Sequence, residues 1–256
     1  MATLMEFAAM QLERETGNRS SFPEDTPTDT RPASIFWDLA AADSLVEHAE
    51  EGGGGKARVI KSKLLVVGCF GPGAAAIEAL VPDASVEQVG IIVLPELSVR
   101  GCRPRVTGSV QRGMCAIWRA VDAGASTIFC NVSDNIPPQR ATAFSRALLS
   151  SVVAERTIIL EHAAARDFGF RLDQLGATCL KSLATSSERD AGRGPPPSDA
   201  VPPGGMVTGV AAALVAMCEM RGRCAALQVA VTPDDGGSHT FEAVCSLTEA
   251  VRAALG

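Results

Sequence analysis

The chain has 256 residues, enough for one large domain or two small ones, and 46% of them are apolar, which suffices for a sizeable core. Its formal net charge of −6 argues against nucleic acid as a main partner, because phosphate binding needs clustered Lys and Arg. Tyr is absent and aromatic residues make up only 4% of the chain, so stacking platforms for single strands are not expected either.

Residues 1–57 are expected to form a largely disordered N-terminal segment that ends in an acidic, Gly-rich linker. Residues 14–33 are rich in Ser, Thr, Pro, Glu and Asp, which cannot bury enough apolar area to offset the entropy of ordering. An apolar patch at residues 35–39 is expected to dock on the core as a short element. The linker, residues 47–56, reads EHAEEGGGGK and contains nothing that would pack.

Residues 58–256 are expected to form a single α/β domain. Apolar runs without alternation are typical of strands buried on both faces, and helices are expected where apolar residues recur at helical spacing. The expected strands are residues 63–70, 89–97, 114–121, 127–132, 157–160 and 225–231, and the expected helices are residues 74–80, 139–154, 206–221 and 241–255. This alternation predicts a three-layer α/β/α structure around a largely parallel sheet. A Ser-, Gly- and Pro-rich stretch at about 184–203 is expected to be a flexible surface loop.

The most distinctive stretch, Pro202 to Thr232, reads PPGGMVTGVAAALVAMCEMRGRCAALQVAVT. A double-Pro, double-Gly turn leads into a helix over residues 206–221. Apolar side chains surround this helix, so it is expected to be buried either in the core or in a partner. Gly209 and Ala213 are small enough to let another backbone come close. With under about eighteen residues, the helix is too short for a membrane span.

The glycines Gly68, Gly71 and Gly73 lie at an expected strand-to-helix turn, where a dinucleotide or phosphate site could form. Their spacing differs from G-x-G-x-x-G, and Pro72 removes one of the backbone N–H donors that such a site would use. We therefore interpret this segment as a tight turn that begins a helix, and we expect no bound cofactor.

Histidine is scarce, with three in the chain, and only His162 is well placed for catalysis, next to Glu161 at the end of an expected strand. Neighbouring residues on a strand point to opposite faces, so these two side chains are not expected to face each other. Glu96 is an isolated acid near the end of another expected strand. No nucleophile motif such as G-x-S-x-G is present, and no His, Cys and Asp cluster has metal-ligand spacing. We expect neither catalytic residues nor a metal site.

Eight cysteines are scattered along the chain without a C-x-x-C pair, a pattern typical of a reduced, intracellular protein. The N-terminal residues include Glu6, Glu13 and Glu15 and no long apolar stretch, so neither a secretory signal nor a transit peptide is expected. We expect a cytoplasmic location that can extend to the nucleus.

The stretch GGMVTGVAAALVAMCEMRGRCAALQVAV resembles the signature of the family that comprises proteasome assembly chaperones 1 and 2 and their archaeal relatives. In that family a Gly-rich turn enters an all-apolar helix and then a strand near the C-terminal end. The segments LLVVGCFGPGAAAIEAL, VGIIVLPEL and ERTIILEHAAARDFGFRL are similar to further parts of the type 1 branch, above all in its plant and green-algal forms. The resemblance covers roughly residues 58–255, and its motifs are hydrophobic patterns without a catalytic fingerprint.

The resemblance implies a non-enzymatic chaperone for assembly of the 20S proteasome core particle. Such a protein would form a heterodimer with proteasome assembly chaperone 2, hold α-subunits while their ring forms, and prevent off-pathway α-ring dimers. Family members commonly end in a hydrophobic–Tyr–any-residue tail, whereas this chain ends in Ala254, Leu255 and Gly256 and lacks Tyr, which implies weaker tail insertion. The candidate protein-binding residues are Gly205, Met206, Gly209, Ala213, Leu255 and Gly256.

Two other interpretations remain open. The first is an α/β enzyme of the hydrolase or phosphorylase type that uses His162 and Glu96 beside the Gly68 turn, in a pocket at the carboxyl ends of the strands. The second is a small-molecule-binding module on the same fold. A chaperone should instead expose an apolar patch large enough to bury another protein.

Overall fold

A computed structural model of the chain describes residues 32–37, 46–50, 56–81, 86–94, 115–120, 126–168, 177–196, 199–233 and 240–255. The described strands are β1 (Ser34–Trp37), β2 (Val46–Glu50), β3 (Lys56–Gly68), β4 (Val86–Val93), β5 (Cys115–Ala120), β6 (Thr127–Asn131), β7 (Val152–Ala164), β8 (Cys179–Ala184) and β9 (Cys224–Thr232). The helices are α3 (Pro72–Leu80), α4 (Pro138–Ser151), α5 (Ser186–Asp190), α6 (Gly209–Met220) and α7 (Thr240–Leu255), with a 3₁₀ turn at Ala165–Phe168.

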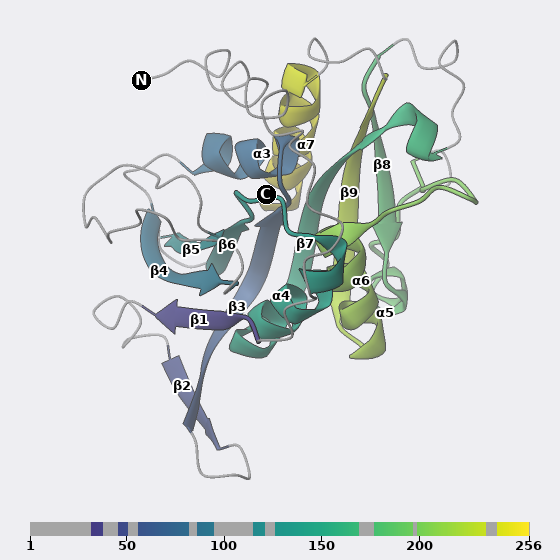
Figure 1. Cartoon of the computed structure of the whole chain (residues 1–256). Helices are drawn as coiled ribbons and strands as arrows, with labels where there is room; N and C mark the ends of the chain where they lie inside the picture. Colours follow the sequence, from purple (N-terminus) through teal and green to yellow (C-terminus); the bar gives the residue numbers. More distant parts are fainter. Residues whose placement is uncertain are drawn as a thin grey trace.

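The strands form one mixed sheet in the order β1-β4-β5-β6-β3-β7-β9-β8, and β2 pairs with β3 outside this path (Figure 1). The expected α/β class is confirmed. The four central strands β6, β3, β7 and β9 are parallel to one another, whereas the strands on both flanks pair antiparallel. The parallel arrangement is therefore confined to the centre. Six residues separate β5 from β6, too few for the helical crossover that parallel neighbours require.

Helices cover both faces of the sheet, which gives the three layers that the alternation of elements predicts (Figure 1). On one face, α4 and α6 pack through Phe144 and Leu214 against Leu65 of β3. On the other, α3 and α7 pack through residues such as Leu247 against Val66. Because successive strand residues point to opposite faces, the unbroken apolar run in β3 supplies both cores.

The core on the α4 and α6 face contains buried free thiols, among them Cys69, Cys115 and Cys130. Burial raises the pKa of Cys115 to about 12 and that of Cys130 well above its usual value. Cys115 and Cys130 therefore behave as small apolar groups within the folded core, as free Cys commonly does.

Two strands of the sheet precede Arg58, where we expected a disordered segment and a linker. The apolar patch docks as predicted, with Ser34–Trp37 forming β1 on β4. Trp37 lies opposite Gly90, where an added Cβ would be only 2.7 Å from the Trp37 ring, so glycine makes room for it. The expectation that residues 47–56 have nothing to pack is wrong for β2, because backbone pairing with β3 needs no apolar side chain. Residues 14–31 and 51–55 lie outside the described part.

The expectation of a flexible loop at 184–203 is wrong for the first half of that stretch. This half contains α5, and it follows strand β8, which the sequence pattern does not predict. Thr185 caps α5, and its backbone N–H donates to the Ala225 carbonyl at 2.9 Å. The Glu188 side chain is fully buried and accepts hydrogen bonds from Arg156 at 2.7 Å and from two nitrogens of Arg193 at 3.0 Å. This ion cluster ties the segment to the start of β7. Residues 197–198 lie outside the described part.

We expect Glu188→Ala to lower the free energy of unfolding by about 3 kcal/mol, because it leaves Arg156 and Arg193 without their buried counter-charge. Urea unfolding followed by circular dichroism measures the change. Glu155→Ala on β7 is the control, since Glu155 is exposed and its loss should stay within about 0.5 kcal/mol. Equal losses in the two variants would contradict a stabilising role for the cluster.

Candidate functional site

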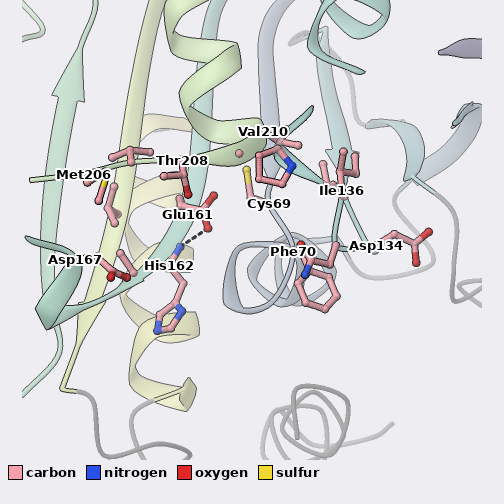
Figure 2. A pocket seen from close by; sticks show the side chains of 17 residues that line it. Cys69, Phe70, Asp134, Ile136, Glu161, His162, Asp167, Met206, Thr208 and Val210 are labelled. Atoms are coloured by element: carbon pink, nitrogen blue, oxygen red, sulfur yellow. Dashed lines mark hydrogen bonds between the residues drawn. The ribbon is translucent and has the colours of Figure 1, made fainter. Parts of the chain in front are cut away.

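A cavity of about 320 Å³ opens at the carboxyl ends of the parallel strands, on the face covered by α4 and α6 (Figure 2). Its lining comes from the segments that follow β3 and β6, from the end of β7, and from the turn that leads into α6. Ligands of open α/β sheets bind in this position, outside the carboxyl ends of the strands. The cavity is therefore the candidate site of the described structure.

Glu161 lines the cavity because β7 continues beyond β3. The last residue of β3, Gly68, pairs with Leu160, so Glu161 retains β9 as a neighbour but has no partner on the β3 side. The Glu161 carboxylate accepts a hydrogen bond from the backbone N–H of His162 at 2.9 Å and another from the Cys69 thiol. Burial raises the pKa of Glu161 to about 7, and these two bonds oppose the rise.

Cys69 lies beside Glu161 but is a poor nucleophile. Burial and the neighbouring carboxylate both raise the pKa of the Cys69 thiol well above its usual value. A reactive cysteine needs a stabilised thiolate, which positive groups or a helix N-terminus normally provide. Here the thiol stays protonated and donates to Glu161, so the pair is unsuited to nucleophilic catalysis.

The side chains of Glu161 and His162 point in different directions, as predicted for neighbouring strand residues (Figure 2). The imidazole Nε2 of His162 lies 2.8 Å from the hydroxyl oxygen of Thr232 on β9. Burial lowers the pKa of His162, and the nearby carboxylate of Asp167 opposes this shift. At neutral pH the ring is therefore uncharged. Glu96, the other acid of the enzyme interpretation, lies outside the described residues.

The Gly68 turn leads from β3 into α3, as we interpreted it. An added Cβ on Gly68 would be 2.3 Å from the carbonyl oxygen of Gly73, and one on Gly73 would be 2.4 Å from that of Leu160. Gly71 has a φ of 87°, which only glycine adopts readily. These three glycines thus allow α3 to pack closely on β3 and β7, and this packing explains their spacing.

The structure places four of the six candidate protein-binding residues around the start of α6. Gly205 packs near Phe168, Met206 is 62% exposed, Gly209 begins the helix, and half-buried Ala213 follows one turn later. Leu255 is 46% exposed but lies on α7, which covers the opposite face of the sheet. Gly256 lies outside the described residues.

Helix α6 is shorter and less buried than its composition suggests. It begins at Gly209 because that residue has a φ of 64°, after Thr208 in an extended conformation. Its buried side is made by Val210, Ala211, Leu214, Met217 and Cys218. Ala216 and Met220 are exposed, and Ala212, Ala213 and Val215 are half-buried. Within the described part of the chain, therefore, only one side of this apolar helix is covered.

Sequence reasoning missed several residues of the cavity, among them Cys69, Asp134, Asp167 and Thr208. The sequence positions of Cys69 and Asp134 could have identified them as cavity residues. Both lie at or just beyond the ends of expected parallel strands, and such ends meet at one edge of a sheet. Thr208 and Asp167 required the tertiary fold.

Within the described ranges, no group of three or more His, Cys, Asp and Glu side chains is placed to hold a metal ion. In the same part of the chain, no helix combines the length and apolar character that crossing a bilayer requires.

No family model matches the chain, and no curated protein matches its sequence. Solved structures share its fold. Pyrococcus furiosus PbaA, described as an archaeal homolog of proteasome-assembly chaperone, is 13% identical, with a TM-score of 0.55 over 88% of this chain and 86% of that one. Pyrococcus furiosus PbaB, described as an archaeal proteasome activator, is 10% identical, with a TM-score of 0.55 over 88% and 97%. A Thermoplasma acidophilum protein of unknown function is 16% identical, with a TM-score of 0.53 over 75% and 76%. The fold is thus that of proteasome-assembly chaperone homologues.

We expect Glu161→Gln to change the pH dependence of stability. The folded chain holds a proton on Glu161 up to about pH 7, whereas the unfolded chain releases it near the ordinary Glu value, so this group's contribution is lost as pH rises through 7. Relative to wild type, the Gln variant should therefore gain about 2 kcal/mol of unfolding free energy between about pH 5 and pH 8.

Urea unfolding of both proteins at the two pH values gives this double difference. Glu155→Gln, at an exposed position on the same strand, should leave the pH dependence unchanged. If Glu161→Gln and Glu155→Gln gave the same pH profile, Glu161 would not be the buried acid described here.

Replacing Gly209 tests the turn into α6. An added Cβ would meet nothing within 4 Å, so the cost of Gly209→Ala comes from the left-handed backbone alone, about 1–2 kcal/mol of unfolding free energy. Gly194→Ala is the control, because its φ lies outside that region and its Cβ would meet only Arg189, whose flexible side chain supplies the nearest atom, Cγ at 3.2 Å. Thermal unfolding compares the two, and an unchanged midpoint for Gly209→Ala would exclude the strained turn.

Proposed function

We propose that this chain is a non-enzymatic chaperone of 20S proteasome assembly, of the type 1 branch. It pairs with proteasome assembly chaperone 2, promotes formation of the α-ring and prevents off-pathway α-ring dimers, in the cytoplasm and also in the nucleus. Two facts support the proposal: the resemblance of residues 202–232 to the family signature, and the fold shared with PbaA over 88% of the chain. A fold alone does not determine function, so the surface that this segment presents is decisive.

The observation that carries the proposal is the uncovered apolar side of α6. Gly209, Ala213, Ala216 and Met220 follow one another at helical spacing along one side of the helix. Met220 is 78% exposed, and Met206, just before the helix, is 62% exposed. Methionine is flexible and polarizable, so it suits a surface that packs against another protein. The segment that carries the resemblance thus offers an apolar surface for a partner.

This surface is held in place by hydrogen bonds. The backbone N–H of Gly205 donates to the Pro202 carbonyl at 2.9 Å, and that of Met206 donates to the Asp167 carbonyl at 3.0 Å. Near the other end of α6, Glu219 accepts bonds from the hydroxyl and the backbone N–H of Ser186, at 2.6 and 2.7 Å. An ordered surface loses less conformational entropy when a partner binds.

The second contact in the proposal, with proteasome α-subunits, is assigned to the end of α7. Leu255 is exposed there, on the layer opposite to α6. The two surfaces lie on different faces of the sheet, so one chain could bind a companion chaperone and an α-subunit at the same time. The absence of Tyr in the chain leads us to assign the tighter anchoring to the companion.

The state of the titratable groups in the cavity supports a non-enzymatic role. The Cys69 thiol and the Glu161 carboxyl bond to each other, and His162 bonds to Thr232. Burial disfavours the thiolate of Cys69 and the protonated form of His162. None of these groups is therefore arranged as an activated nucleophile with its base.

Affinity purification of the tagged chain from its native cells, followed by mass spectrometry, tests the proposal. We expect the companion chaperone and proteasome α-subunits with few mature β-subunits. Ala213→Glu should reduce recovery of the companion at least about tenfold, since it places a charge within the apolar surface. Recovery of the chain without α-subunits would overturn the assembly role.

Ala254→Glu is the matched control. Like Ala213, Ala254 is a half-buried helical alanine packed at the margin of a core, but it lies on α7, on the other layer. Both variants should unfold at similar temperatures, and only Ala213→Glu should lose the companion. Equal recovery with both variants would place the companion's binding surface elsewhere.

A further inference from the structure

The cavity described above has no role in the proposed chaperone function. It is a hollow of about 320 Å³, which falls at the lower end of the range for small-molecule sites. Three chain segments far apart in the sequence close around it: the turn after β3, the turn after β6, and the turn before α6 (Figure 2). This construction resembles a preformed ligand pocket more than a packing defect, because polar groups line part of it.

The polar part of the lining is acidic. Asp134, Glu161 and Asp167 contribute three carboxyl groups, and none of the described residues that line the cavity is Lys or Arg. His162 is uncharged at neutral pH because burial lowers its pKa. The start of α6 adds a partial positive charge, and the Arg166 guanidinium lies 3.7 Å from the Asp167 carboxylate. Above about pH 7, where Glu161 is ionised, the three carboxylates outweigh both. An anionic ligand such as a phosphate would therefore be repelled, whereas a cation or an N–H donor would be attracted.

Acceptors for such a donor are present within the cavity. The Glu161 carboxylate accepts from the His162 backbone and from Cys69, and a carboxylate has about four lone-pair sites. The Thr208 side chain lines the same space and makes no capping hydrogen bond to α6. Both groups could therefore bond to an N–H group of a ligand.

The remaining wall is apolar and would suit a ring. Phe70, Ile136, Val207 and Val229 come from different elements and line the cavity. The exposed Met206 side chain also belongs to the lining, and a thioether makes favourable contacts with aromatic rings. A small apolar ring would replace water against these side chains.

We infer that this cavity binds a small ring-containing molecule that carries an amine, amidine or amide N–H group and no anionic group. The inference goes beyond the assembly role and is independent of it: the chain could bind such a molecule whether or not it acts on proteasome subunits.

Three probes of equal size and different charge test the inference on the full chain: benzamidine is a cation, benzamide is neutral, and benzoate is an anion. Binding is measured by protein-observed NMR titration at about pH 8, where the Glu161 carboxyl is ionised. We expect benzamidine to bind at least about tenfold more tightly than benzoate, with benzamide between them. The shifted amide signals should include those of Cys69, Phe70 and Thr208.

Glu161→Gln keeps the shape of the side chain and removes its charge. It should weaken benzamidine binding about fivefold or more and leave benzamide binding within about twofold. Glu155→Gln, exposed on the same strand, should change neither. Should Glu161→Gln fail to fold, Asp167→Asn provides the same test, because its side chain is 47% exposed and its backbone carbonyl, which binds Met206, is retained.

Any of four results would overturn the inference. Benzoate could bind as tightly as benzamidine, the variants could bind benzamidine like Glu155→Gln, or the shifted signals could lie away from the cavity. Failure of all three probes to shift any signal at about 10 mM would also exclude it, since ring-sized ligands of a real pocket bind at or below that range.

Discussion

The carboxyl edge of the sheet depends on one close approach, where α3 packs on β3 and β7. The backbone N–H of Cys69 donates to the Leu160 carbonyl at 2.9 Å, and that of Val132 donates to the Gly68 carbonyl at 2.9 Å. Beyond these bonds β3 ends and its chain turns toward one face, while β7 continues beside β9. This difference in strand length leaves Glu161 without a β3 neighbour, and the cavity forms in the space that β3 vacates. A side chain on Gly68 or Gly73 would separate α3 from the strands and remove this geometry.

The segment from residue 202 to 220 contributes to three parts of the molecule at once. One side of α6 completes the core with Leu214 and Met217, and the residue before the helix, Thr208, lines the cavity. Its other side, with Ala216 and Met220, is open to a partner. An apolar helix of this kind predicts burial without indicating how burial is divided between the chain and another protein. This division is visible only in the fold.

Much of the fold follows from the sequence because central strands that are buried on both faces, such as β6 and residues 64–68 of β3, appear as largely apolar runs. The errors occur where tertiary contacts outweigh local pattern. Strand β7 begins at Val152, although Val152 and Val153 continue the helical spacing of α4. Glu188 looks like a loop residue until it meets Arg156, thirty-two positions earlier in the chain. In the site, adjacency predicts that Glu161 and His162 diverge, but nothing local indicates that Cys69 lies beside Glu161.

The buried thiols on one face of the sheet have a practical consequence. Because burial disfavours the thiolates of Cys69, Cys115 and Cys130, an alkylating reagent can react with them only after the surrounding structure opens. Their labelling rates would therefore measure the free energy of local opening at three adjoining strands, without any engineered reporter. Cys245 on α7, which is less buried, would label before these three and report fraying of the opposite layer. The labelling rates of the native cysteines would thus show the order in which the layers of the fold open.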